Sequence, residues 1–179
     1  RVVIGWLGSP STEKYLELIR PVLEELFKSH DNLEMHVVGG GDFHLTWTAV
    51  QHIPWRMETE VETLLRFDIG LMPLPLEEWS RGKSGGKART YMAAGVVPVC
   101  SAIGYNLELI DQERTGFLVE TPQQWLATLN NLIESPELRE SIGRAARLEV
   151  ERRFSVTGQA EKLKNLLGIA IEHQRQTRN

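Results

Sequence analysis

Short apolar runs alternate along the chain with segments that carry apolar residues at helical spacing, and this alternation limits the fold more than any other feature. The run at 2–7 ends at Gly8, and leucine and isoleucine then recur at helical spacing as far as Leu26. Strands that alternate with helices form parallel βαβ units. We therefore predict an α/β fold with a doubly wound, mainly parallel, six-stranded Rossmann-like sheet and C-terminal helices. The expected strands are residues 2–7, 34–38, 48–53, 68–74, 96–100 and 116–119, and the later helices are 58–66, 87–94, 122–133, 136–153 and 156–174.

The 179 residues, of which 41% are hydrophobic, suffice for one compact domain. The net charge of −4 argues against general nucleic-acid binding but leaves room for a local basic pocket. The single cysteine, Cys100, excludes an internal disulfide, and its place at a strand end predicts an inert core thiol. No apolar run could cross a bilayer, and no signal peptide precedes the first strand. Because the chain enters a strand directly after Arg1, we expect a fragment of a longer protein.

Ligands of a doubly wound sheet bind beyond the carboxyl ends of its strands, so the loops at that edge are the candidate site. These loops are 8–12, 39–44, 53–57, 73–86 and 101–106. The stretch 81–87 is the most informative, because it places three cations and three glycines before a helix. Such a helix start, with its free amides, predicts an anion site, and a solvated basic loop is the alternative.

A second anion site is suggested at 8–12, where hydroxyl side chains follow a strand and Lys14 lies one turn into the next helix. Plain helix capping by the same hydroxyls is the alternative.

Helix 58–66 is expected to face inward through Val61, Leu64 and Leu65.

Several familiar motifs are absent. Glu77 stands where a Walker A loop needs glycine, and His44 takes the last glycine position of a dinucleotide fingerprint. No Asp-x-Asp pair occurs and no histidine has zinc-site spacing, so we expect no metal. Asp42 and Asp68 do not form the acidic cluster of a response regulator.

The chain resembles the C-terminal domain of the family 4 (group 1) glycosyltransferases over nearly its whole length. The matching stretches are residues 6–12, 67–75, 91–95, 98–99 and 116–118, with Trp79, Gly82, Lys83, Gly85, Lys87, Ser101, Gly104, Asn106 and Glu108, and the helix that contains Leu138, Arg139 and Gly143. The resemblance implies the GT-B architecture, in which this domain holds a nucleoside diphosphate (NDP)-sugar donor. An N-terminal domain that is not part of this chain would hold the acceptor.

The resemblance also implies roles for individual residues. Lys83 and Lys87 would be the catalytic side chains, because they would meet the departing diphosphate. The other implied donor-binding residues are Gly8, Ser9, Lys14, Trp55, Arg81, Gly82, Ser84, Gly85, Gly86 and Thr90. Trp55 would border the base.

Two departures from the family pattern affect this site. Many relatives carry two glutamates with seven residues between them, and Gly82 and Thr90 stand at these positions. Thr90 can still hydrogen-bond a hydroxyl group but cannot form a charge-assisted bond. Ser9 replaces an arginine that usually follows the first glycine.

We therefore expect residues 1–179 to be one donor-binding domain of a retaining glycosyltransferase, inactive without its partner domain. The helix 156–179 would pack elsewhere, with disorder or an intermolecular contact beyond Gly168. The expected setting is synthesis of a glycan or cell-envelope polysaccharide in the cytoplasm, at the inner membrane face, with a membrane-bound or lipid-linked acceptor. No cofactor and no nucleic-acid partner are expected, and the oligomeric state is open. The alternative is a non-catalytic nucleotide-sugar-binding or scaffold protein with a degenerate glycosyltransferase fold.

Overall fold

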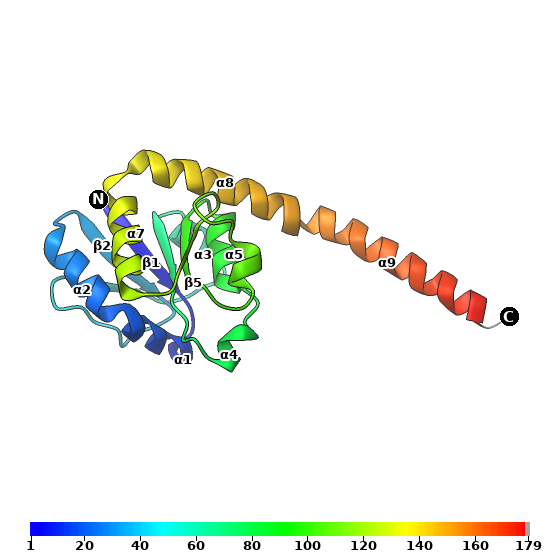
Figure 1. Ribbon diagram of the computed structural model, residues 1–179, viewed down its shortest axis with the longest axis horizontal. Helices are drawn as coiled ribbons and strands as arrows, with labels where there is room; N and C mark the ends of the chain where they lie inside the picture. The colour runs from blue at the N-terminus through cyan, green and yellow to red at the C-terminus, as the bar shows by residue number, and fades with distance from the viewer. Residues whose placement is uncertain (178–179) are drawn as a thin grey trace.

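A computed structural model describes residues 1–177 and confirms the predicted doubly wound fold. Its six strands form one sheet in the order β3-β2-β1-β4-β5-β6, and every pairing between strands is parallel (Figure 1). The strands are β1 Val2–Leu7, β2 Leu33–Val38, β3 Val50–Ile53, β4 Ile69–Met72, β5 Val97–Ser101 and β6 Phe117–Val119.

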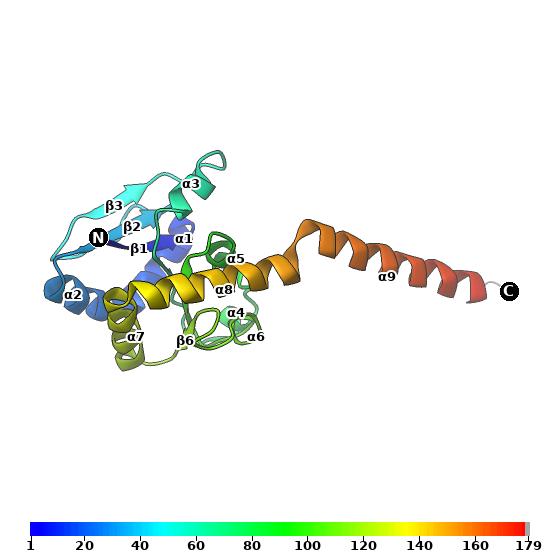
Figure 2. The same cartoon turned by 90° about the horizontal axis from the view of Figure 1, so that it is seen from above.

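Helices cover both faces of the sheet, which explains why the strands are apolar throughout. On one face, α2 (Arg20–Ser29) and α7 (Pro122–Glu134) bury Leu23 and Leu129 against β1, β4 and β5. On the other face lie α3 (Glu60–Leu64) and α5 (Gly86–Ala93), and α8 (Pro136–Phe154) crosses from α7 to α5, as Figure 2 shows from above. Cys100 is fully buried between β5 and this second layer, and burial raises its pKa, as expected of an inert core thiol.

The structure corrects several predicted helices. The first is divided into α1 (Pro10–Glu13), a 3-10 helix η1 (Lys14–Ile19) and α2. Two short helices, α4 (Glu78–Arg81) and α6 (Asn106–Leu109), replace parts of predicted loops. In α3 only Leu64 is buried, so the inward orientation predicted for Val61 and Leu65 is wrong. A five-residue helix makes little more than one turn, and only one of its side chains reaches the core.

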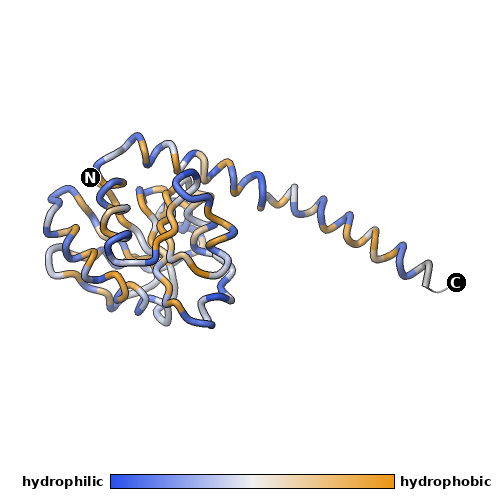
Figure 3. The backbone as a smooth tube through the Cα atoms, in the orientation of Figure 1, coloured by the Kyte–Doolittle hydropathy of each residue, from blue (hydrophilic) through white to orange (hydrophobic). Residues whose placement is uncertain are grey.

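The last helix, α9 (Val156–Thr177), leaves the core and extends away from it (Figure 1). The hydropathy colouring in Figure 3 shows apolar positions along this helix. Leu163, Leu166 and Leu167 are among its exposed residues. The described residues beyond Gly168 are helical as far as Thr177 and exposed as far as Gln174, so the disorder or intermolecular contact predicted there stays a prediction. Residues 178 and 179 lie outside the described part.

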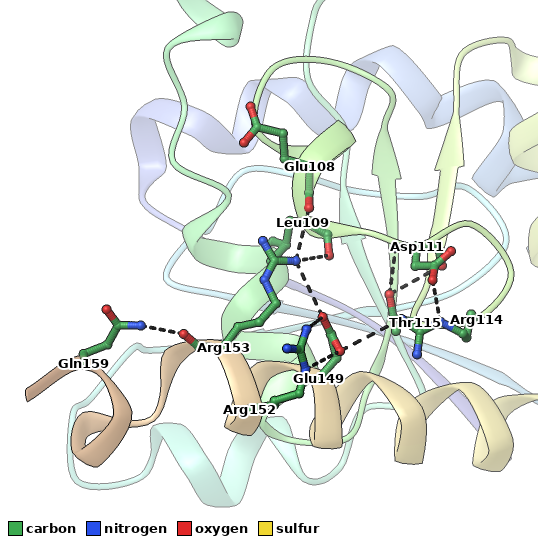
Figure 4. A network of polar contacts seen from close by, with 9 residues as sticks. All are labelled: Glu108, Leu109, Asp111, Arg114, Thr115, Glu149, Arg152, Arg153 and Gln159. Atoms are coloured by element: carbon green, nitrogen blue, oxygen red, sulfur yellow. Dashed lines mark hydrogen bonds and ion pairs between the residues drawn. The ribbon is translucent and has the colours of Figure 1, made fainter. Parts of the chain in front are cut away.

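A polar network fixes the end of α8, from which α9 starts (Figure 4). Arg153 donates to the backbone carbonyls of Glu108 and Leu109 at 3.1 and 3.5 Å. Glu149 lies 2.7 Å from Arg152 and 3.9 Å from Arg114. These contacts join α8 to α6 and to the segment between α6 and β6. In the described part of the chain, no helix is both long and apolar enough to span a membrane.

Candidate functional site

The strand order reverses between β1 and β4, and the candidate site lies where these two strands separate. They pair only at Ile4 with Ile69 and at Gly5 with Gly70. Beyond this point β1 pairs with β2 while β4 pairs with β5, so the loops that follow them diverge. A doubly wound sheet binds ligands in the crevice that this reversal creates.

Tyr91 of α5 bridges the two separating strands. Its hydroxyl group accepts a hydrogen bond from the Leu7 amide at 2.9 Å and donates one to the Leu71 carbonyl at 3.1 Å. The side chain is fully buried, and burial raises the pKa of its phenol. Gly70 leaves room for the ring, since a Cβ at Gly70 would lie 2.5 Å from it. Tyr91 therefore connects α5 to both strands beside the site.

A pocket of roughly 240 Å³ lies between the loop after β1 and the start of α5. Gly85 caps α5 with a left-handed φ of 66°, which favours glycine, and the helix begins at Gly86. The amides of a helix start and its dipole attract anions. The lining residues are Ser9, Thr12, Tyr15, Met72, Leu74, Lys83, Ser84, Gly85, Gly86 and Lys87.

Lys87 is the most unusual charge in this pocket. Its ammonium group lies 4.5 Å from the centre of the Trp6 ring and donates to the Thr12 hydroxyl at 3.3 Å. Burial, and secondarily the nearby charge of Lys83, lower the pKa of Lys87 to about 8. Among the described residues, neither lysine forms an ion pair with a carboxylate. An anionic ligand would supply the missing countercharge.

Two further hollows of roughly 390 Å³ each continue the site past Gly8 toward β3. Both are lined by Gly39 and by Trp55, whose side chain is half exposed and donates its indole N–H to Glu60. A Cβ at Gly39 would lie 2.1 Å from the Gly8 carbonyl oxygen, so this close approach of two loops requires glycine. The exposed face of Trp55 offers a flat surface on which a planar ring could stack.

Glu13 holds the loop at the far side of the site. Its carboxylate accepts backbone hydrogen bonds from Gly41 at 3.0 Å, Asp42 at 3.1 Å and Phe43 at 3.0 Å. Burial alone would raise the pKa of Glu13, but the three amides and the neighbouring His52 together lower it. In the sequence, Glu13 is only an acidic residue close to a helix start. No local pattern reveals its distant partners.

The structure brings together most of the predicted site residues. The sheet edge gathers Gly8, Ser9, Trp55, Lys83, Ser84, Gly85, Gly86 and Lys87.

Four other predicted residues do not line these hollows. Lys14 is exposed beside the Tyr15 ring, and Arg81 and Gly82 are exposed on and after α4. The hydroxyl of Thr90 donates to the Gly86 carbonyl at 3.0 Å, within its own helix. Their roles in donor binding stay predictions.

The fold and this crevice define a Rossmann-like domain with a candidate ligand site at the sheet's switch point. Residues 1–135 match the family described as glycosyl transferases group 1. The chain belongs to that family, and the resemblance inferred from its motifs is confirmed.

Known proteins agree with this assignment. Spore coat protein SA of Bacillus subtilis is 36% identical over 75 residues, which are 40% of this chain and 20% of that protein. The solved structure of Anabaena HepE in complex with UDP-glucose has a TM-score of 0.75, with 17% identity over 94% of this chain and 49% of that one. A mutant of S. aureus TarM in complex with fondaparinux, alpha-GlcNAc-glycerol and UDP has a TM-score of 0.71, with 18% identity over 92% of this chain and 35% of that one. This chain thus spans half or less of each of these relatives.

Proposed function

We propose that this domain binds the NDP-sugar donor of a retaining glycosyltransferase. The observation that carries the proposal is the pair Lys83 and Lys87, which line one pocket with the start of α5 and have no carboxylate partner in the described part of the chain. A diphosphate has the size and charge to occupy that pocket. The structures of HepE and TarM, which have the same fold, were solved with UDP-glucose and with UDP.

The proposed orientation of the donor follows from the two ends of the site. The diphosphate lies between Ser9 and the amides of Gly85 and Gly86, within reach of both lysines. The nucleoside extends past Gly8 toward Trp55.

The reaction moves a sugar from the diphosphate to an acceptor hydroxyl with its anomeric configuration retained. The bond between the anomeric carbon and the diphosphate oxygen breaks, and its electron pair leaves with the diphosphate. Fixed positive groups lower the barrier by stabilising this developing charge, without a metal or other cofactor. The acceptor oxygen, bound by a second domain of a longer protein, forms the new bond to the anomeric carbon, and its hydroxyl proton passes to the departing diphosphate. We place this transfer in the synthesis of a cell-envelope polysaccharide, on the cytoplasmic face of the membrane.

Binding of nucleotides by the 179-residue chain tests the proposal. Titration calorimetry at pH 7 with ADP, GDP, UDP and their glucose esters should show binding of at least one ligand. Lys83→Ala should weaken it about tenfold or more, as expected for one lost charge-assisted contact of about 1.5–3 kcal/mol.

Lys28→Ala is the matched control. Lys28 also lies over a tryptophan ring, at 5.3 Å from Trp47 against 5.2 Å for Lys83 and Trp79. Lys28 lies in the last turn of α2, near the amino ends of the strands, whereas the pocket lies at their carboxyl ends. The Lys28→Ala substitution should therefore leave ligand binding unchanged. If no ligand binds the unmodified chain, or both variants bind alike, the proposal is wrong.

One observation favours the non-catalytic alternative. The Thr90 hydroxyl is engaged by the Gly86 carbonyl, at a position where the family resemblance implies a glutamate that contacts the ribose. A protein that keeps the donor pocket but transfers no sugar would fit this loss. Sugar transfer by the protein in its natural length, abolished by Lys83→Ala, would exclude the alternative.

A further inference from the structure

The buried carboxylate of Glu13 connects the two halves of the candidate site. Glu13 ends α1, the turn that begins just after Ser9, and its backbone amide donates to the Ser9 carbonyl at 3.2 Å. Its side chain extends the other way and accepts hydrogen bonds from three consecutive amides, those of Gly41, Asp42 and Phe43. The side chain is only 4% exposed. Glu13 therefore contacts both the turn that follows β1, through Ser9, and the loop that follows β2.

The loop that Glu13 holds forms one wall of the Trp55 end of the site. Gly39 and Gly40 line the hollow beside Trp55, directly before the three amides that Glu13 binds. The Gly39 amide also donates to the Ile53 carbonyl at 3.0 Å, which places this loop beside the segment that leads to Trp55. The far end is anchored by Phe43, which is buried and lies 4.7 Å from the guanidinium of Arg20.

The loop after β2 approaches the Glu13 carboxylate so closely that one of its positions has no room for a side chain. A Cβ at Gly40 would lie 2.5 Å from the Glu13 carboxyl carbon, closer than side chains pack. A Cβ at Gly41 would have nothing within 4 Å, so the tight fit is confined to Gly40. The carboxylate and the loop thus meet in one arrangement, and three charge-assisted hydrogen bonds stabilise it.

We propose that Glu13 is a positioning residue that fixes the Gly39–Phe43 loop for the nucleoside part of the donor. This inference rests on the proposed function, since it assigns the Trp55 end of the site to the nucleoside. The Glu13 side chain does not line the lysine pocket, and Glu13 contacts the pocket residue Ser9 through its backbone amide, which a side-chain substitution keeps. Its loss should therefore weaken binding of the nucleoside while leaving the diphosphate subsite intact.

Comparing a nucleoside diphosphate with inorganic pyrophosphate isolates this effect. The nucleoside diphosphate that binds the unmodified chain best is measured by calorimetry, and pyrophosphate is measured by competition against it. In Glu13→Gln an amide N–H₂ replaces one acceptor oxygen and faces the backbone N–H groups. We expect the dissociation constant for the nucleoside diphosphate to rise about tenfold, while that for pyrophosphate changes less than about twofold.

Glu140→Gln is the matched control, because it removes the same charge at an exposed position of α8. Glu140 pairs with Arg144 of the same helix, away from the loop after β2. Both dissociation constants should remain unchanged in this variant. Gly40→Ala perturbs the same contact from the opposite side without altering the carboxylate, and it should reproduce the selective loss. Thermal unfolding confirms that each variant is folded, and Gly40→Ala decides the question if Glu13→Gln does not fold.

The outcomes separate this inference from the proposed function. If the unmodified chain binds no nucleoside diphosphate, or pyrophosphate does not compete, the proposed function is wrong. Suppose instead that the unmodified chain binds both ligands. If the folded variants then lose affinity equally for both ligands, or keep their affinity for both, the role proposed for Glu13 is wrong and the proposed function stands.

Discussion

Replacing Lys87 by methionine should make the domain more stable while weakening its binding of an anionic ligand. The folded protein keeps this ammonium group largely buried, with a pKa of about 8 against an ordinary value of 10.5. At about 1.36 kcal/mol per pH unit, that difference means that keeping Lys87 charged costs the folded state about 3 kcal/mol at pH 7. Methionine has a similar length and carries no charge. Since it also loses the bond to Thr12, we expect a gain of about 1–3 kcal/mol in the free energy of unfolding.

The pH dependence of this gain has a definite sign. The pKa of Lys87 is lowered on folding, so the unfolded chain binds more protons between about pH 8 and 10.5. The destabilisation is complete below about pH 8 and fades as the pH rises toward 10.5. The advantage of Lys87→Met should therefore shrink by about 1 kcal/mol between pH 7 and pH 9.

Urea unfolding followed by circular dichroism, in buffers without phosphate or sulfate, measures both effects. The midpoint for Lys87→Met should rise by about 1 M urea at pH 7. Lys28→Met, on an exposed lysine, should change stability by less than about 0.5 kcal/mol. Equal or lower stability of Lys87→Met at pH 7, or a gain that does not vary with pH, would refute the reasoning. A charge that costs stability in the free protein is typical of a functional site.

Two other predictions follow from the same site. Donor affinity should fall about tenfold between pH 7 and pH 9, because the diphosphate binds the protonated form of Lys87. Calorimetry at the two pH values measures this decrease. The Lys87→Met variant should lack it, because any pH dependence left in that variant comes from ionisation of the ligand. Tyr91→Phe should lower the free energy of unfolding by about 2–3 kcal/mol, because the buried Leu7 amide and Leu71 carbonyl lose their partner. Urea unfolding measures this loss against Tyr15→Phe, and equal losses in the two variants would contradict the bridging role of Tyr91.

Much of the fold is predictable from local patterns. The βα alternation, the six strands and the helices α7 and α8 follow from the periodicity of apolar residues and from cap residues such as Thr121 and Ser135. The errors lie where a helix is very short, as in α3, α4 and α6. Such helices depend on the tertiary contacts of one or two side chains, which spacing does not reveal.

The candidate site divides in the same way. The stretch 82–87 is recognisable because glycine, cations and a helix start are adjacent in sequence. The structure adds Glu13 and Tyr91, whose partners lie up to 30 and 84 positions away along the chain. It also shows that Thr90 is hydrogen-bonded within α5. These contacts arise only when the sheet has formed and its strands separate at the switch point.

The sequence by itself therefore determined the sheet, its longer helices, the family and the basic loop, because these depend on periodicity and on residues that are neighbours in the chain. Tertiary structure alone decided the pKa of Lys87, the last residue of that stretch. It places Lys87 against the Trp6 ring and the Thr12 hydroxyl, and that burial, together with Lys83, lowers the pKa of Lys87 to about 8. The physical reason is that a pKa depends on desolvation and on charges in space, and the residues that remove water from Lys87 are distant from it in sequence.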